Sequence, residues 1–285
     1  MLREPSGLVK ATGVIESDFG MTSGLGAERG LAIELARAAG ELLRGELLGP
    51  RRIAYKGSPT NLVTEMDARV EALIVERLLA AFPGDAILAE ERGAQAGRSG
   101  RRWIIDPLDG TTNYAHGLPL YGVSIALEIA GRVRLGVVYD PSQHELFVAE
   151  RGAGASCNDA PLRVSSTATL DGSLLATGFP YDIRVNADNN LPEYAAFATR
   201  TRGVRRLGSA VLYLAWVAAG RFDGYWELRL GPWDVAAGGL MVEEAGGRLT
   251  ALGGGPVDLE APTVVASNGR IHDDMLAVLR EIRGS

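Results

Sequence analysis

The segment RRWIIDPLDGTTNYAHG, residues 101–117, changes abruptly from apolar to acidic residues. Its large apolar side chains, Trp103 to Ile105, predict a buried strand, and two aspartates, Asp106 and Asp109, follow at once. Carboxylates this close repel each other and raise each other's pKa unless a cation lies between them. The segment therefore predicts a cation-binding site at the end of a buried strand.

The second part of this segment has the composition of a helix start. Pro107 lacks a backbone N–H, which favours a turn, and residues 110–113 read Gly-Thr-Thr-Asn. Free backbone N–H groups at a helix start bind anions. Acids that bind a cation, beside amides that bind an anion, indicate a phosphate held by a metal ion. Taken alone, Asp-Gly followed by threonine also fits an ordinary turn.

Two further acids stand at the ends of expected elements. Glu90 follows a predicted strand over residues 86–89, and Asp234 lies in the first turn of a helix that Pro232 and Trp233 begin. Carboxylates without histidine or cysteine among them suit hard divalent cations. We therefore expect Mg²⁺ rather than zinc, and no organic cofactor.

The rest of the chain predicts helices and strands in layers, an α/β fold. Helices are expected at residues 28–48, 65–81, 210–219, 233–245 and 271–282, an antiparallel meander at 123–129, 133–137 and 146–148, and strands at 173–177 and 264–267. The expected units are a flexible N-terminal extension (1–27), a metal-binding α+β half (28–160) and a C-terminal α/β half (161–285).

Composition limits the partners. A net charge of −6 and a pI of about 5.3 give no basic footprint, so we expect no direct nucleic-acid contact. The single cysteine, Cys157, excludes an intrachain disulfide and favours a cytoplasmic location. No apolar run approaches the roughly 20 residues of a membrane span, so we expect no membrane partner.

The string DPLDGTTNY (106–114) resembles the signature of the inositol monophosphatase family, the lithium-sensitive, magnesium-dependent phosphomonoesterases. The strings LAEE, NLVTEMD, GSAVLYLAWVAAGRFDGYWE and PWDVAAGGLMVEEAGG resemble its other blocks in the expected order, and the resemblance covers residues 28–283. It implies a layered α/β/α/β/α fold with an N-terminal antiparallel sheet and a C-terminal mixed α/β half. It also implies a homodimer, with the active site between the two halves.

The resemblance implies a role for individual residues. The metal ligands would be Glu90, Asp106, the carbonyl of Leu108, Asp109 and Asp234, for two or three Mg²⁺ ions. The catalytic residues would be Glu90, Thr111 and Asp67, and the substrate would be bound by Asp109, Gly110, Thr111, Ala210, Glu227 and Asp234. Lys56 would lie near the site. On the residues alone, Asp67 also fits a helix cap and Lys56 a surface lysine.

The implied reaction is hydrolysis of a sugar- or polyol-phosphate monoester, with myo-inositol 1-phosphate as the first candidate. A metal-activated water would attack phosphorus in line. Similar enzymes act on histidinol phosphate or fructose 1,6-bisphosphate with the same metal ligands, and some members of the family act as regulatory binding proteins. These alternatives remain open at the level of the sequence.

Overall fold

The protein is described here by a computed structural model that covers residues 24–50 and 52–284. The helices are α1 (Gly26–Glu46), α2 (Glu65–Ala81), α3 (Thr111–Ala115), α4 (Leu191–Ala198), α5 (Ala210–Ala218), α6 (Pro232–Glu244) and α7 (His272–Arg283). Most of the predicted N-terminal extension lies outside the described residues. Its last four positions, 24–27, are described, and residues 26 and 27 form the start of α1.

An eight-stranded sheet forms the first β layer. Its strand order is β10 (Ala160–Pro161), β9 (Gly154–Cys157), β8 (Glu145–Glu150), β7 (Arg132–Asp140), β6 (Gly122–Ile129), β5 (Arg101–Asp109), β3 (Ala86–Ala89) and β4 (Gly93–Gln95). The meander predicted from alternating apolar residues is confirmed in β6, β7 and β8. Among the described pairs of this sheet only β3 and β5 run parallel, so the sheet is antiparallel but for one pair. A separate hairpin of β1 (Ile53–Tyr55) and β2 (Leu62–Thr64) precedes α2.

A five-stranded mixed sheet forms the second β layer. Its order is β12 (Gly203–Arg205), β11 (Leu174–Thr177), β13 (Gly224–Glu227), β15 (Val264–Ser267) and β14 (Arg248–Thr250). Strand β11 runs parallel to both of its neighbours, whereas β13, β15 and β14 pair antiparallel.

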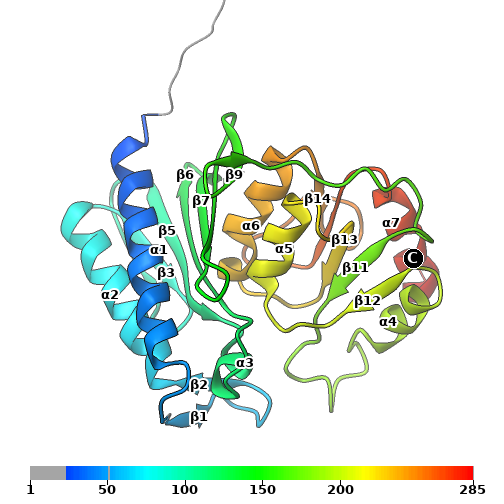
Figure 1. The fold of residues 1–285 in the computed structure, drawn as a ribbon, viewed down its shortest axis with the longest axis horizontal. Helices are drawn as coiled ribbons and strands as arrows, with labels where there is room; N and C mark the ends of the chain where they lie inside the picture. The colour runs from blue at the N-terminus through cyan, green and yellow to red at the C-terminus, as the bar shows by residue number, and fades with distance from the viewer. Residues whose placement is uncertain (1–23, 51, 285) are drawn as a thin grey trace, which may run out of the picture.

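The helices complete five layers, the α/β/α/β/α arrangement that was predicted (Figure 1). Helices α1 and α2 cover the outer face of the first sheet, α5 and α6 lie between the sheets, and α4 and α7 cover the second sheet. Within the described ranges no helix is long and apolar enough to cross a membrane.

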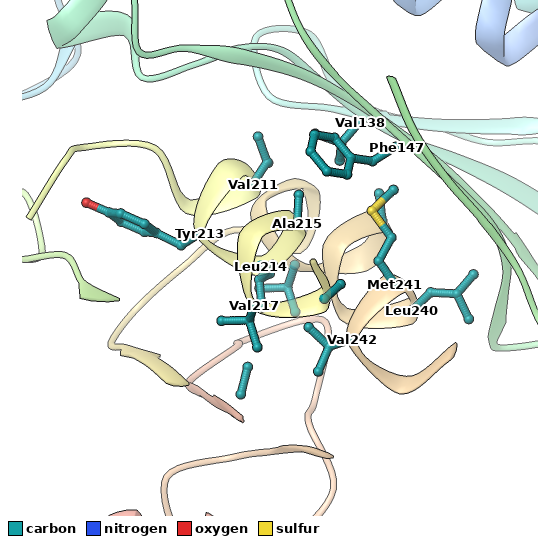
Figure 2. Packing of buried hydrophobic residues seen from close by; sticks show 14 of the residues in the cluster. Val138, Phe147, Val211, Tyr213, Leu214, Ala215, Val217, Leu240, Met241 and Val242 are labelled. Atoms are coloured by element: carbon teal, nitrogen blue, oxygen red, sulfur yellow. The ribbon is translucent and has the colours of Figure 1, made fainter. Parts of the chain in front are cut away.

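The central layer joins the two halves through one hydrophobic core. Val138 and Phe147 of the first sheet face Met241 of α6 and Val211 of α5 (Figure 2). Close packing there depends on Gly136, because a Cβ at this position would lie 2.8 Å from the backbone of α6. The sheets and the helices between them therefore form one continuous packing unit.

Candidate active site

Three aspartates from both halves of the chain meet beside the central layer. Asp106 and Asp109 come from β5, and Asp234 comes from the first turn of α6. Each offers a carboxylate oxygen, and these oxygens lie within 4.8 Å of one another. Asp106 is only 1% exposed. The cation site predicted from the 101–117 segment is thus represented by a compact carboxylate cluster, which we call the aspartate cluster.

The prediction that the strand ends before Asp106 is wrong, because β5 continues to Asp109. In a regular strand, residues three apart point to opposite faces. Here the pairing with β6 shifts between Asp106 and Asp109, around Pro107, and Asp106 accepts a hydrogen bond from the Leu108 N–H at 3.0 Å. Such an irregularity redirects side chains at the edge of a site. It brings both carboxylates to the same cluster.

The electrostatics of the cluster call for a cation. Burial, together with the charges of Glu90 and the other two aspartates, raises the pKa of Asp106 well above its ordinary value. Burial likewise raises the pKa of Asp109 to about 6. Carboxylates and a nearby carbonyl, with no nitrogen or sulfur ligand in the group, form a donor set that fits a hard divalent cation.

Glu90 follows β3 and lies next to the cluster, where it is paired with a lysine. Lys56 in the β1–β2 hairpin places Nζ 3.0 Å from Glu90 Oε1 and also bonds to Glu91. Burial raises the pKa of Glu90 to about 7, against the opposing charge of Lys56. Glu90 therefore adjoins the three aspartates without belonging to their 4.8 Å group.

The short helix α3 begins against the cluster. Its first residue, Thr111, places Oγ1 3.1 Å from Asp67 Oδ1 and 3.0 Å from the Leu108 carbonyl. The other oxygen of Asp67 accepts hydrogen bonds from the N–H and hydroxyl of Thr64, at 2.8 and 2.7 Å. Asp67 thus caps α2 and also holds Thr111, so the two interpretations of this residue are compatible.

The residues predicted to bind the substrate come from both halves and line one cavity. Asp109 accepts hydrogen bonds from the Val211 N–H at 3.0 Å and from the Ser209 hydroxyl, which ties it to the start of α5 beside Ala210. Glu227 ends β13, and burial raises its pKa to about 7. Asp234 is oriented by the Gly231 N–H at 2.6 Å.

A cavity of about 530 Å³ connects these groups. Its lining includes the predicted residues Glu90, Asp106, Leu108, Asp109, Gly110, Thr111, Ala210, Glu227 and Asp234, and also Lys56. Asp67 lies behind Thr111 and does not line it. The size suits a small phosphorylated molecule.

Sequence reasoning missed several lining residues, Tyr181 and Arg229 among them. Burial and the charges of Glu90 and the aspartate cluster raise the pKa of Tyr181. Arg229, whose φ is +54°, pairs with Asp182 at 3.1 Å and so holds the loop that carries Tyr181. No periodic pattern marks this loop. Ser209 was also missed, although a serine before an apolar helical run is a recognisable cap signal.

A five-layer α/β fold, with a carboxylate cluster beside a helix start and inside a small-molecule cavity, is typical of metal-dependent phosphatases. Comparison with known proteins identifies the family within this class. The sequence profile of the Inositol monophosphatase family matches residues 28–284. An "Inositol-1-monophosphatase" of Synechocystis is 46% identical over 251 residues, 87% of each chain. The "Nus factor SuhB" of Escherichia coli K12 is 42% identical over 254 residues, 88% of this chain and 95% of that protein.

Solved structures agree with the sequence comparison. An inositol monophosphatase from Anabaena superposes with a TM-score of 0.82 at 44% identity, covering 90% of this chain and 97% of that one. The chain belongs to the inositol monophosphatase family, and it is a phosphatase.

Proposed function

We propose that this chain hydrolyses a sugar- or polyol-phosphate monoester, with myo-inositol 1-phosphate as its first substrate and Mg²⁺ as its cofactor. The observation that carries the proposal is the shared cavity, in which the aspartate cluster lies at one side and Glu227 at another. The aspartate cluster suits a phosphate held by cations, and the Glu227 carboxylate is an acceptor for ring hydroxyls.

Each residue has a proposed part in the reaction. Asp106, Asp109, Asp234, Glu90 and the Leu108 carbonyl would hold two or three Mg²⁺ ions. When bound, Mg²⁺ neutralises phosphoryl oxygens and lowers the pKa of water. The N–H groups of Gly110 and Thr111 would hold the phosphate, and the Thr111 hydroxyl, supported by Asp67, would orient the attacking water. Monoester hydrolysis is among the slowest uncatalysed reactions, requiring acceleration up to the order of 10²¹.

The test is phosphate release with Mg²⁺ from a panel of esters: inositol 1-phosphate, histidinol phosphate, fructose 1,6-bisphosphate and a nucleoside 3′,5′-bisphosphate. We expect the highest kcat/KM with inositol 1-phosphate. A preference for histidinol phosphate or fructose 1,6-bisphosphate would replace the proposed substrate and keep the proposed metal ligands. Cleavage of none of them would contradict the proposal.

A regulatory binding role is the second candidate, because the Escherichia coli relative bears the name "Nus factor SuhB". Retention of a specific partner by the Asp106→Asn variant, which we expect to lack turnover, would support it. If removal of the metal also abolished binding of the partner, the partner would instead depend on the catalytic site.

The family resemblance also supports a homodimer in the cytoplasm, which we include in the proposal. Light scattering coupled to size exclusion, across a range of protein concentrations, measures the mass directly. A mass of one chain at all concentrations would contradict the dimer.

A further inference from the structure

Tyr225 is a buried residue whose hydroxyl is hydrogen-bonded to the carboxylate of Glu227. The side chain of Tyr225 is 0% exposed, and its hydroxyl donates to Glu227 Oε2 at 2.7 Å. The two residues are two positions apart on β13, so their side chains lie on the same face of the strand. A phenol hydroxyl in this place donates one hydrogen bond and fixes one of the two carboxylate oxygens.

Gly178 supports the same carboxylate from the neighbouring strand. It directly follows β11, whose Thr177 is paired with Trp226 of β13, so Gly178 comes beside Glu227. A Cβ at Gly178 would lie 2.0 Å from Glu227 Oε1 and 2.2 Å from Oε2. Any side chain at position 178 would therefore displace the carboxylate.

The backbone of Gly178 is held in place by buried polar groups. Asn190, 0% exposed, donates from Nδ2 to the Gly178 carbonyl at 2.7 Å. The indole N–H of Trp226 in turn donates to Asn190 Oδ1 at 2.7 Å. Buried polar networks that are fully hydrogen-bonded hold one geometry. The surface against which Glu227 rests is thus rigid.

We propose that Gly178 and Tyr225 are positioning residues, which together hold Glu227 so that Oε1 is presented to the cavity. No described residue donates a hydrogen bond to Oε1, whereas Oε2 is occupied by Tyr225. Oε1 therefore accepts a hydroxyl of the alcohol part of the substrate, and its placement sets the preference for esters of polyols over esters without hydroxyls. This inference rests on the proposed function.

Gly178→Ala is the most direct test, because the three atoms nearest to the added methyl group all belong to the end of the Glu227 side chain. Gly178 does not have a positive φ, so alanine fits its backbone and the fold is kept. We expect the ratio of kcat/KM for inositol 1-phosphate to kcat/KM for p-nitrophenyl phosphate to fall at least about tenfold, the lower end of the value of one hydrogen bond to a charged group. Tyr225→Phe should lower this ratio in the same direction, mainly through KM for the inositol ester.

Two matched variants provide the controls. Gly30→Ala adds a methyl group on α1 where no atom lies within 4 Å. Tyr139→Phe removes a hydroxyl that lies 3.4 Å from Glu41 and from His144, in the first half. Neither should change the ratio. In a Glu227→Ala background, Gly178→Ala should have little further effect, because the carboxylate through which it acts is then absent.

The outcomes separate this inference from the proposed function. A ratio unchanged by Gly178→Ala and by Tyr225→Phe, in an enzyme that prefers the inositol ester, overturns the positioning role alone. A wild-type enzyme without that preference overturns the proposed substrate class. In that case crystal structures of both variants decide the positioning role, and a Glu227 side chain that has not moved in either would overturn it.

Discussion

The hydroxyl of Thr111 lies 3.1 Å from Asp67 Oδ1 and 3.0 Å from the carbonyl of Leu108. A hydroxyl has one hydrogen, so it donates to only one of these acceptors at a time. Donation to Asp67 leaves the Leu108 carbonyl free to bind a cation and leaves a lone pair on Thr111 for a water molecule. In the proposed mechanism, the side chain of Asp67 would thus influence both a metal ligand, the Leu108 carbonyl, and the position of the attacking water.

Thr111→Val should lower kcat about 100-fold with little change in KM, because in the proposed mechanism the hydroxyl would orient the water and valine has nearly the same shape. Thr111→Ser keeps the hydroxyl and should retain most of the activity. Steady-state kinetics with inositol 1-phosphate and saturating Mg²⁺ measure both. A valine variant within about twofold of wild type would remove Thr111 from the mechanism.

Asp106→Asn should abolish turnover. The loss should exceed the roughly 100-fold expected for a residue that only supports a metal ligand. Without metal its free energy of unfolding should not fall below that of wild type, because one of several repelling carboxylates is gone. Phosphate release and urea unfolding test the two parts. Asp171→Asn, at an exposed position outside the cavity, is the control and should change neither. Retained activity in the Asp106 variant would refute the ligand assignment.

The stabilisation by Mg²⁺ should grow as the pH rises. Burial raises the pKa of Asp109 to about 6 and that of Glu90 to about 7. These groups stabilise the metal-free fold below their unfolded pKa, near 4, and lose that contribution as the pH rises through 6 to 7. Mg²⁺ would bind the ionised forms and so should recover more stability at about pH 8 than at about pH 5.

Thermal unfolding with Mg²⁺ and with a chelator, compared at each pH, measures this increment. Taking the difference removes most of the effect of His272, whose pKa burial lowers to about 4 and which changes stability in the opposite sense. An equal increment at both ends of the pH range would mean that Mg²⁺ does not bind the titrating carboxylates.

Gly110→Ala should destabilise the fold by about 1–3 kcal/mol. Gly110 has φ +86°, and a Cβ there would lie 2.8 Å from the Leu120 carbonyl. Gly117 has φ +72° but only a side-chain atom at 3.8 Å, so Gly117→Ala should cost about 1 kcal/mol, from backbone strain alone. Urea unfolding compares the two. Equal losses would show that the contact with Leu120 relaxes without cost.

How well an element could be predicted depended on local chemical signals. Residues 65–81 were predicted as a helix and form α2 with the same bounds, because Thr64 and Asp67 make a capping box and Pro83 follows the end. The first helix begins two residues before its predicted start. No side chain caps it at Leu25, so the sequence carries no signal there.

The residues of the site divide in the same way, into those with a local sequence signal and those without one. Asp106, Asp109 and Asp234 could be chosen because they end apolar runs or begin a helix. The shift in strand pairing that aligns the first two depends on β6, which is distant in sequence, and could not be foreseen. Tyr181 and Arg229 are brought to the cavity by ion pairs to a loop without periodicity, and such long-range contacts leave no local pattern.

Helix α6 contributes Asp234 from its first turn, while the rest of the helix is wedged between the two sheets. A cation bound by Asp234 would therefore be connected through α6 to the central layer of the molecule. When Mg²⁺ binds, protection of backbone amides against hydrogen exchange should rise together in β7, β13 and α5. The reason is that local opening of any of these elements would also loosen α6, which carries the metal ligand Asp234. In this architecture a metal ion bound by Asp234 would stabilise the central layer, so that cooperative unfolding and catalytic activity would depend on the same helix.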